Sequence, residues 1–351
     1  DARGRPGGGR FPPVEGRPRD GPAASGRAHR VGGERDDDDD DGDDDDWRRR
    51  GRRKKDGTRA IDNGRDGQDR ASVTFEGRVL SGGFDRVEVQ VLRDGQPFQV
   101  VDQALSYAAG EAAFALSAEI DAGFHDYEAK VRLLAGSSAT PAVVRGRIIC
   151  GDTFLIQGQS NAGAWDFTNE GVANQAKSPW IRSFGSSVDN AGTVFDQTWD
   201  EADAEVEYGH SAIGQWGHVL AQRLVATQGV PIAIVNGAVG GTNSTQHQRD
   251  VSDPENLDSI YGRLLWRARL AGIASTARAL LWYQGESDGG NETLHGQNFA
   301  ALYADWHADF ATIEQLYVFQ VRTGCGVGGR SVREVQRQLP SLYPDLRLMS
   351  T

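Results

Sequence analysis

The spacing of apolar and polar residues changes along the chain and divides it into segments of different character. Between residues 72 and 149, short stretches alternate apolar and polar positions with a period of two, as at 87–91 and 127–133. Turn residues such as Asp94-Gly95 separate these stretches. Such alternation is typical of strands with one buried face. Around seven of these stretches predict a small all-β sandwich, an accessory domain at 72–149.

After Cys150 the pattern changes to continuous apolar runs that alternate with longer stretches of helical periodicity. The apolar runs lie at 153–157, 231–236, 278–283 and 316–321, and the helical stretches lie near 213–228, 259–275 and 296–313. Continuous apolar runs are expected where a strand is buried on both faces. Their alternation with helices predicts an α/β domain at 150–351, in which helices cover both faces of a parallel sheet.

Residues 1–71 show neither periodicity. They are rich in glycine and arginine, contain acidic runs at 36–41 and 43–46, and have few large apolar residues. Such a segment buries too little apolar surface to offset its ordering entropy, so we expect a disordered low-complexity segment. The alternatives are a cation-binding acidic run and a nucleic-acid-binding arm at 48–55. An unbroken run of aspartates lacks the Gly-containing turn of strong Ca²⁺ sites, which favours the disordered linker.

The charge of the chain argues against two classes of partner. Residues 1–70 hold equal numbers of basic and acidic residues, so the formal net charge of −12 belongs to the remainder. An acidic folded part disfavours nucleic acid and anionic membranes as partners. No apolar run approaches the roughly 20 residues that a membrane-spanning helix needs. The chain as given opens with Asp1-Ala2-Arg3, without an initiator Met or a signal peptide, so we expect a processed product or a fragment.

The two cysteines are expected to be free thiols. Cys150 precedes the apolar run at 153–157, whereas Cys325 follows the run at 316–321. If both runs are parallel strands, the two thiols lie at opposite ends of the sheet, beyond the reach of a disulfide.

Three polar turns follow apolar runs of the α/β domain, and together they carry the candidate chemistry. Residues 158–161 read GQSN, residues 236–242 read NGAVGGT, and residues 284–288 read QGESD. In a parallel sheet these turns lie along one edge, where open α/β sheets bind their ligands. A serine nucleophile, a glycine-rich loop with exposed backbone N–H groups and a side-chain amide are the groups that acyl transfer uses.

These blocks resemble sequence blocks of a known group of enzymes. GQSN, VGGT and WYQGESD resemble three sequence blocks of the SGNH hydrolase superfamily, and more narrowly its sialate O-acetylesterase and acetylxylan esterase branch of carbohydrate esterases. The resemblance extends from about Gly151 to the C-terminus. It implies a three-layer α/β/α fold with a five-stranded parallel sheet. It also implies a serine esterase that removes O-acetyl groups from carbohydrate without a cofactor.

The resemblance assigns roles to single residues. Ser160 would be the nucleophile, and its own backbone N–H would contribute to the oxyanion hole. Gly240 would be the second backbone donor and Gln284 a side-chain donor. The supporting residues are Gly241, which allows close approach of the substrate, Glu286, which orients its loop, and the flanking Gln159 and Asn161. Loss of one oxyanion donor typically costs about 10²–10³ in rate, so we expect Gln284→Ala to be severe without being total.

The general base of the family is missing from this sequence. SGNH enzymes take it from an Asp-x-x-His block after the final strand, and residues 332–338 and 346–351 resemble the helix and strand that precede that block. His295 and His210 have a glutamate at the same spacing, but both come before the last strand, where the family does not place its base. A serine without a base is a poor nucleophile, so we expect impaired activity if the chain ends at Thr351.

Two alternatives to an active serine esterase stay open at this stage. One is a catalytically impaired carbohydrate-binding protein that keeps the pocket without the base. The other is a metal-dependent hydrolase. The absence of clustered spacings such as His-x-x-x-His argues against it, so we expect no metal.

The expected partner is an acetylated carbohydrate. Trp165, Trp180 and Trp216 are candidates for stacking on sugar rings, although burial is the commoner fate of tryptophan. The resemblance and this substrate imply a secreted or periplasmic protein.

Overall fold

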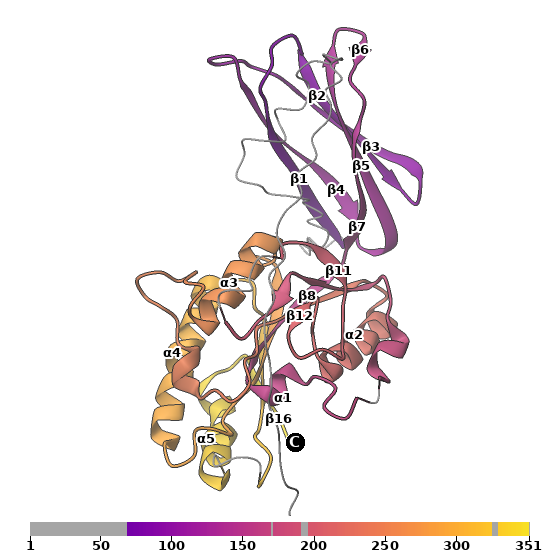
Figure 1. The fold of residues 1–351 in the computed structure, drawn as a ribbon. Helices are drawn as coiled ribbons and strands as arrows, with labels where there is room; N and C mark the ends of the chain where they lie inside the picture. The colour runs from indigo at the N-terminus through magenta and orange to yellow at the C-terminus, as the bar shows by residue number, and fades with distance from the viewer. Residues whose placement is uncertain (1–68, 170, 191–195, 325–328, 351) are drawn as a thin grey trace, which may run out of the picture. The chain divides into compact units, whose positions relative to one another are not determined.

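The computed structural model describes residues 69–169, 171–190, 196–324 and 329–350 (Figure 1). The segment predicted to be disordered at 1–71 lies outside these ranges up to residue 68, and so do the acidic and basic runs. Arg70 and Ala71 belong to the first strand, so the β region begins slightly before the predicted boundary at 72. Cys150 is buried, whereas Cys325 lies outside the described residues, so the two free thiols stay a prediction.

The first region consists of two antiparallel sheets that share one core. β1 (Arg70–Val79) pairs with β4 (Ala112–Asp121). The second sheet contains β3 (Gln96–Ala104), β2 (Arg86–Arg93), β5 (Gly123–Ala135), β6 (Ser138–Ala139) and β7 (Val143–Cys150). The core holds Val73 and Ile120 of the first sheet together with Val89 and Tyr127 of the second. The period-two alternation of the sequence therefore corresponds to strands with one buried face.

The second region is built on a seven-stranded sheet with the order β11-β9-β13-β8-β14-β15-β16. Its strands are β8 (Asp152–Gly158), β9 (Ile181–Phe184), β11 (Trp199–Glu201), β13 (Ile232–Asn236), β14 (Ala277–Tyr283), β15 (Gln315–Phe319) and β16 (Leu346–Met349). In the described part of the chain, neighbouring strands of this sheet are parallel except for the edge pair β11 and β9. The sheet exceeds the five strands that the resemblance implies, because β9 and β11 extend it beyond β13. A separate short pair is β10 (Ser186–Ser187) with β12 (Gly209–His210).

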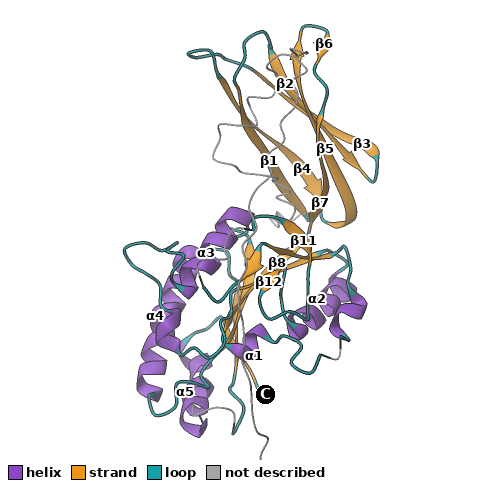
Figure 2. Ribbon diagram, in the orientation of Figure 1, coloured by secondary structure: helices purple, strands orange, loops and turns teal. Residues whose placement is uncertain are grey.

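Helices cover both faces of this sheet (Figure 2). They are α1 (Ser160–Gly163), α2 (Gln215–Gln228), α3 (Ile260–Ala271), α4 (Glu292–Asp309) and α5 (Gly329–Leu342), with the short 3-10 helices η2 (Ala173–Ala176) and η4 (Ser244–His247). Successive residues of β8 point to opposite faces: Leu155 joins a core with α3 and α4, and Ile156 joins a core with α2. The predicted mixed α/β domain with a mostly parallel sheet is therefore confirmed. Within the described residues, no helix combines the length and the apolar character that a membrane crossing needs.

The sheet topology brings the three polar turns to one edge. β8 lies between β13 and β14, and the three strands run in the same direction. The turns at 158–161, 236–242 and 284–288 begin at the carboxyl ends of these strands. They are therefore neighbours at the edge where α/β sheets bind ligands.

Candidate active site

Ser160 is the first residue of α1 and lies on a tight turn at the end of β8. Gly158 forms this turn with a φ of 143°. A side chain there would collide with β14, since a Cβ on Gly158 would lie 2.0 Å from the Tyr283 carbonyl oxygen. The Gln159 N–H donates to the same carbonyl at 3.1 Å. The turn therefore presents Ser160, which is exposed, from a position that β8 and β14 fix together.

Glu286 contacts both neighbours of Ser160. Its carboxylate accepts hydrogen bonds from the side-chain amides of Gln159 and Asn161. The oxygen of the Gln159 amide accepts a further bond of 3.1 Å from the Ser287 hydroxyl. Gln159 and Glu286 are 2% and 5% exposed, so the bond between them is charge-assisted and shielded from water. The structure thus brings three residues predicted to support Ser160 into direct contact with one another.

The glycine-rich loop after β13 lies directly beside Ser160. The Val239 N–H donates to the Gly158 carbonyl at 2.9 Å, which ties the loop to the serine turn. A Cβ built on Gly240 would lie 3.9 Å from the Ser160 Cβ. Gly241 has a φ of 73°, and no described atom lies within 4 Å of its Cβ position. The loop therefore places Gly240 next to the serine and leaves open space at Gly241.

The Gly240 N–H has a partner that the sequence did not reveal. It donates to the Tyr208 hydroxyl with an N–O distance of 2.8 Å. Burial raises the pKa of Tyr208, and this effect with the nearby carboxylates of Glu207 and Asp189 outweighs the opposite effect of the Gly240 bond. The phenol therefore keeps its proton at neutral pH. A contact between a side chain and the backbone of a distant loop leaves no periodic signal in the sequence. In the sequence analysis, the segment around Tyr208 was considered only for His210.

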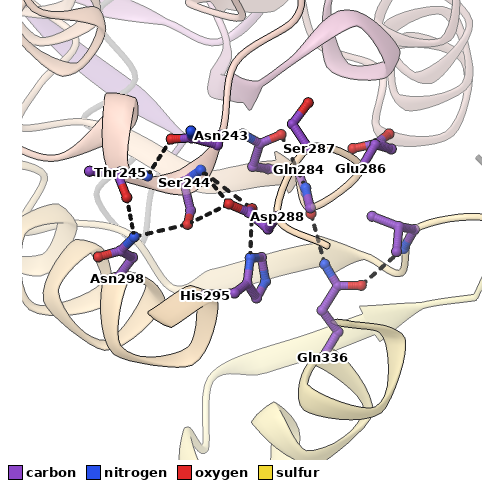
Figure 3. Close-up of polar contacts among 12 residues, drawn as sticks. Asn243, Ser244, Thr245, Gln284, Glu286, Ser287, Asp288, His295, Asn298 and Gln336 are labelled. Atoms are coloured by element: carbon purple, nitrogen blue, oxygen red, sulfur yellow. Dashed lines mark hydrogen bonds and ion pairs between the residues drawn. The ribbon is translucent and has the colours of Figure 1, made fainter. Parts of the chain in front are cut away.

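Gln284 is fully buried beneath the glycine-rich loop. Its Nε2 donates to the Thr242 carbonyl at 2.8 Å, and its Oε1 accepts from the Gly285 N–H at 3.1 Å. Its own carbonyl accepts a bond of 2.8 Å from Gln336 Nε2 on α5 (Figure 3). The amide of Gln284 therefore supports the loop from within, and its donation to an oxyanion stays a prediction.

Asp288 joins the third turn to η4 and α4 (Figure 3). Its carboxylate accepts bonds of 3.0 Å from the N–H and the hydroxyl of Ser244 and lies 2.9 Å from His295 Nδ1. Burial raises the pKa of Asp288, but the bonds from His295 and Ser244 outweigh burial and hold the pKa below its usual value. Asn298 Nδ2 extends the network by donating to the hydroxyls of Ser244 and Thr245. This network fixes the third turn from behind.

The histidines of the described residues all have polar partners other than Ser160. His125 contacts Asp94, His210 contacts Asp196 and Asp200, His218 contacts Gln222, His247 contacts Thr242 and Gln157, His295 contacts Asp288, and His307 contacts Asp345. His295 is only 1% exposed. Burial lowers the pKa of His210, but Asp196 and Asp200 outweigh it and raise that pKa. Across the described ranges, no group of three or more His, Cys, Asp or Glu side chains is placed to hold a metal ion.

The three candidate tryptophans have different surroundings. Trp216 Nε1 donates to the Asn161 carbonyl at 2.7 Å. Trp180 packs against the core that α3 and α4 share. Trp165 follows α1 and pairs with Phe167 at a ring-centroid distance of 5.0 Å, and Phe167 is 81% exposed. Trp165 and Phe167 therefore form the aromatic pair suited to stacking on a ligand.

A cavity of about 450 Å³ adjoins the glycine-rich loop. Its lining consists of Asp189, Asn190, Val239, Thr242, Gln246, Asp258, Ile260 and Arg263. Val239 and Thr242 belong to the glycine-rich loop and flank its Gly240-Gly241 pair. Arg263 is 5% exposed and donates to the backbone carbonyls of Leu257, Asp258 and Asp189, which fixes the cavity walls. Six of the eight lining residues have polar side chains, which suits a ligand with hydroxyl groups.

The domain is a mostly parallel sheet covered by helices on both faces, with a serine turn and a glycine-rich loop at one edge. The chain belongs to the family of sialic acid-specific acetylesterases, which are carbohydrate esterases, and the model of this family matches residues 150–349. The resemblance of the three sequence blocks is therefore confirmed.

Solved structures with a similar fold include a carbohydrate acetylesterase from Xanthomonas citri. It is 19% identical with a TM-score of 0.52, and the match covers 83% of this chain and 66% of that chain. The chain thus spans just under two thirds of this relative, and the likeness shows the fold alone.

Weaker likenesses exist to two further structures. A protein from Arabidopsis thaliana is 21% identical with a TM-score of 0.44, over 57% of this chain and 85% of that chain. An acetyl xylan esterase from the rumen bacterium Butyrivibrio proteoclasticus is 9% identical with a TM-score of 0.29, over 83% and 86% of the two chains. Neither likeness is close enough to support an argument. A search of curated protein sequences found no match.

Proposed function

We propose that the protein is a serine esterase that removes O-acetyl groups from carbohydrate through an acetyl-Ser160 intermediate. The observation that carries this proposal is the arrangement around Ser160. The residue is exposed, while the side chains of both its neighbours are bonded to Glu286. Bonds that fix the neighbours also fix the backbone position of Ser160, and preorganised catalysis requires such a fixed position. A serine with a purely structural role gains nothing from exposure between two immobilised residues.

In the proposed reaction, Ser160 Oγ attacks the acetyl carbonyl carbon and the sugar leaves as an alcohol. Water then hydrolyses the acetyl-enzyme. The N–H of Ser160 donates a hydrogen bond to the acyl oxygen, because the N–H of the first residue of a helix has no partner within the helix. Gly240 supplies the second N–H, and Gln284 keeps the Gly240 loop in place through its bond to Thr242. A base must take the proton of Ser160. We do not assign this role to any of the described histidines.

We assign two surfaces of this domain to the binding of the sugar. The exposed Phe167 and its partner Trp165 offer aromatic faces, on which sugar rings stack. The polar cavity next to Val239 and Thr242 offers partners for sugar hydroxyls. A substrate of this kind belongs outside the cytoplasm, so we place the protein in a secreted or periplasmic location.

A catalytically impaired carbohydrate-binding protein is the second candidate function. One observation favours it: the hydrogen bonds and ion pairs of the described histidines join them to residues other than Ser160. A serine at its ordinary pKa reacts slowly even beside a formed oxyanion hole. Such a protein would bind acetylated sugar at the same edge of the sheet without turnover.

The experiment compares the wild-type chain with Ser160→Ala on 4-nitrophenyl acetate and on an acetylated xyloside. We expect Ser160→Ala to lower kcat at least about 10³-fold, as loss of a serine nucleophile does. Ser275→Ala, which alters an exposed serine just after α3, serves as the matched control and should keep wild-type kcat. Phenylmethylsulfonyl fluoride should label Ser160, detected by mass spectrometry of the peptide.

Three outcomes separate the candidates. Loss of turnover and of labelling in Ser160→Ala alone supports the esterase. Turnover that persists in Ser160→Ala contradicts the assignment of the nucleophile. Absence of turnover in the wild type, with binding of the acetylated xyloside retained in calorimetry, supports the binding protein.

A further inference from the structure

The Tyr208 hydroxyl stands where an acyl oxygen would bind. Its oxygen accepts the Gly240 N–H at 2.8 Å, and the donors of an oxyanion hole lie about 2.7–3.1 Å from the oxyanion. Gly240 also faces Ser160. A Cβ on Gly240 would lie 3.4 Å from the Tyr208 hydroxyl oxygen and 3.9 Å from the Ser160 Cβ. Gly240 therefore has the Tyr208 hydroxyl and the Ser160 side chain as close neighbours.

We propose that Tyr208 determines how readily the ester binds: its hydroxyl occupies the Gly240 N–H in the free protein, and the acyl oxygen of the substrate must displace it. The inference rests on the proposed function, because it takes Gly240 as the second oxyanion donor. Tyr208 forms no covalent bond to the substrate. Its effect is therefore on substrate affinity and separate from the chemistry at Ser160.

The relative strengths of three hydrogen bonds support this exchange. Tyr208 keeps its proton, so its oxygen is a neutral acceptor for the Gly240 N–H. A neutral ester carbonyl replaces it with a bond of similar strength, whereas an oxyanion forms a charge-assisted bond about twice as strong. The hydroxyl thus competes with the ground-state substrate and is displaced before the transition state. Competition of this kind raises KM and leaves kcat nearly unchanged.

The Tyr208 hydroxyl already has a second partner in the Glu207 carboxylate, and this hydrogen bond is one of the causes that raise the pKa of Tyr208. Glu207 Oε1, like the Tyr208 hydroxyl oxygen, lies 3.4 Å from the Cβ position of Gly240. A carboxylate is an acceptor, so the phenol proton has a partner when the acyl oxygen takes the Gly240 amide. The Ser187 hydroxyl donates to the Glu207 carbonyl at 3.4 Å and holds this segment against β10. The exchange therefore leaves no donor without an acceptor.

The test is Tyr208→Phe, which removes only the hydroxyl. One neutral hydrogen bond alters an equilibrium by roughly 2- to 10-fold. We expect KM for 4-nitrophenyl acetate to fall by that factor, with kcat within about twofold of wild type. Tyr317→Phe, at a half-buried tyrosine on β15, is the matched control and should leave KM unchanged.

Acetate provides a readout that does not depend on turnover. Its carboxylate resembles the acyl oxygen, and the Gly240 amide reports on it in ¹H–¹⁵N spectra. In Tyr208→Phe this amide should exchange its hydrogen faster in the absence of ligand. It should also report acetate binding that is roughly 2- to 10-fold tighter than in the wild type, in line with the loss of one competing hydrogen bond.

Two results would overturn the proposal. If Tyr208→Phe lowers kcat tenfold or more, the hydroxyl stabilises the transition state. Unchanged KM together with unchanged exchange at Gly240 would show that the hydroxyl does not occupy the amide. If the wild-type chain hydrolyses no ester, the proposed function fails, and the acetate titration alone decides the role of Tyr208.

Discussion

The side-chain amide of Gln159 donates to the carboxylate of Glu286, 127 positions away in the sequence. Gln159 follows β8 and Glu286 follows β14, so this bond crosses between the carboxyl ends of adjacent parallel strands. Asn161 donates to the other oxygen of the same carboxylate. One buried carboxylate therefore holds both neighbours of Ser160, and the position of Ser160 depends on the pairing of two strands.

Glu286→Gln should lower both turnover and stability. The change removes the charge and replaces one acceptor oxygen with an N–H₂ group that faces an amide donor. A hydrogen bond to a charged group contributes about 1.5–3 kcal/mol, so we expect the free energy of unfolding in urea to fall by about that amount. A displacement of about 1 Å at the serine costs up to about 10² in rate, so kcat for 4-nitrophenyl acetate should fall about 10- to 100-fold.

Two further variants give this prediction its controls. Glu286→Asp keeps the charge on a shorter side chain and should lie between the wild type and Glu286→Gln in kcat. Glu334→Gln alters an exposed carboxylate on α5 and should change neither quantity. Wild-type kcat in Glu286→Gln would show that the two bonds do not position Ser160.

The strands that carry the site were predictable because burial on both faces leaves apolar residues at every position. The runs at 153–157 and 278–283 match β8 and β14 to within one residue at each end. The short strands β9 and β11 were not predicted, because four and three residues are too few for a pattern. The helix expected at 296–313 begins earlier, at Glu292, since its first turn is fixed by the polar contact of His295 with Asp288.

The partners of single polar groups could not be predicted from the sequence. The resemblance gave Gln284 the role of a hydrogen-bond donor to the oxyanion. In the structure its side-chain amide donates to the Thr242 carbonyl, a partner that the glycine-rich loop provides. Tyr208 precedes the short strand β12 and meets Gly240 only when β13 has brought its loop to the same edge. Such contacts depend on tertiary packing, which periodicity does not encode.

Two glycines of the site should respond differently to a methyl group. The Cβ of Gly240→Ala would lie 3.4 Å or more from its neighbours, so we expect the free energy of unfolding to stay within about 1 kcal/mol of wild type. The methyl group would occupy space beside Ser160, and kcat/KM for 4-nitrophenyl acetate should fall at least about tenfold because a small misplacement is costly. Gly158→Ala would place its Cβ 2.0 Å from a carbonyl oxygen at a φ of 143°. Strain and overpacking there should cost about 2–6 kcal/mol.

Urea unfolding and steady-state kinetics distinguish the two glycine variants. The prediction is contradicted if Gly240→Ala keeps full kcat/KM, since the loop would then have no part in the reaction. It is also contradicted if the urea concentration at the midpoint of unfolding is the same for Gly158→Ala as for the wild type, since the turn would then have room for a side chain.

His295→Gln should leave turnover largely intact. His295 is 1% exposed, and its Nδ1 lies 2.9 Å from Asp288, so we expect it to support the third turn. A glutamine amide can also donate to Asp288, and kcat should stay within about tenfold of wild type, far from the loss caused by removing a base. The melting temperature should fall by about 2–4 °C for each 1 kcal/mol lost. If kcat instead falls by about three orders of magnitude, His295 is the base.

His247 is fully buried beside the glycine-rich loop and is held in one neutral form. The Thr242 hydroxyl donates to the Val239 carbonyl at 2.7 Å, so its oxygen accepts from His247 Nε2 at 2.8 Å. His247 Nδ1 then faces Gln157 Nε2 at 3.5 Å, because the Gln157 oxygen accepts from Trp306 Nε1. A proton on Nδ1 would thus face another donor. Burial lowers the pKa of His247 to about 3.

This buried histidine should make the protein less stable as the pH falls. In the unfolded chain His247 titrates near its ordinary pKa of 6.5, and in the folded protein its pKa is about 3. Below pH 6.5 the unfolded state therefore binds more protons, and stability is lost progressively toward pH 3, while above pH 6.5 the contribution is complete. At pH 5 the loss from this group is about 2 kcal/mol relative to pH 7.

His247→Gln removes the titrating group and keeps an amide donor for Thr242. Between pH 7 and pH 5, its free energy of unfolding in urea should fall by about 2 kcal/mol less than that of the wild type. Between pH 7 and pH 8.5 the two proteins should change in parallel, which serves as the internal control. Equal losses in both proteins between pH 7 and pH 5 would mean that folded His247 titrates at its ordinary pKa, and the neutral bonding to Thr242 and Gln157 would then be wrong.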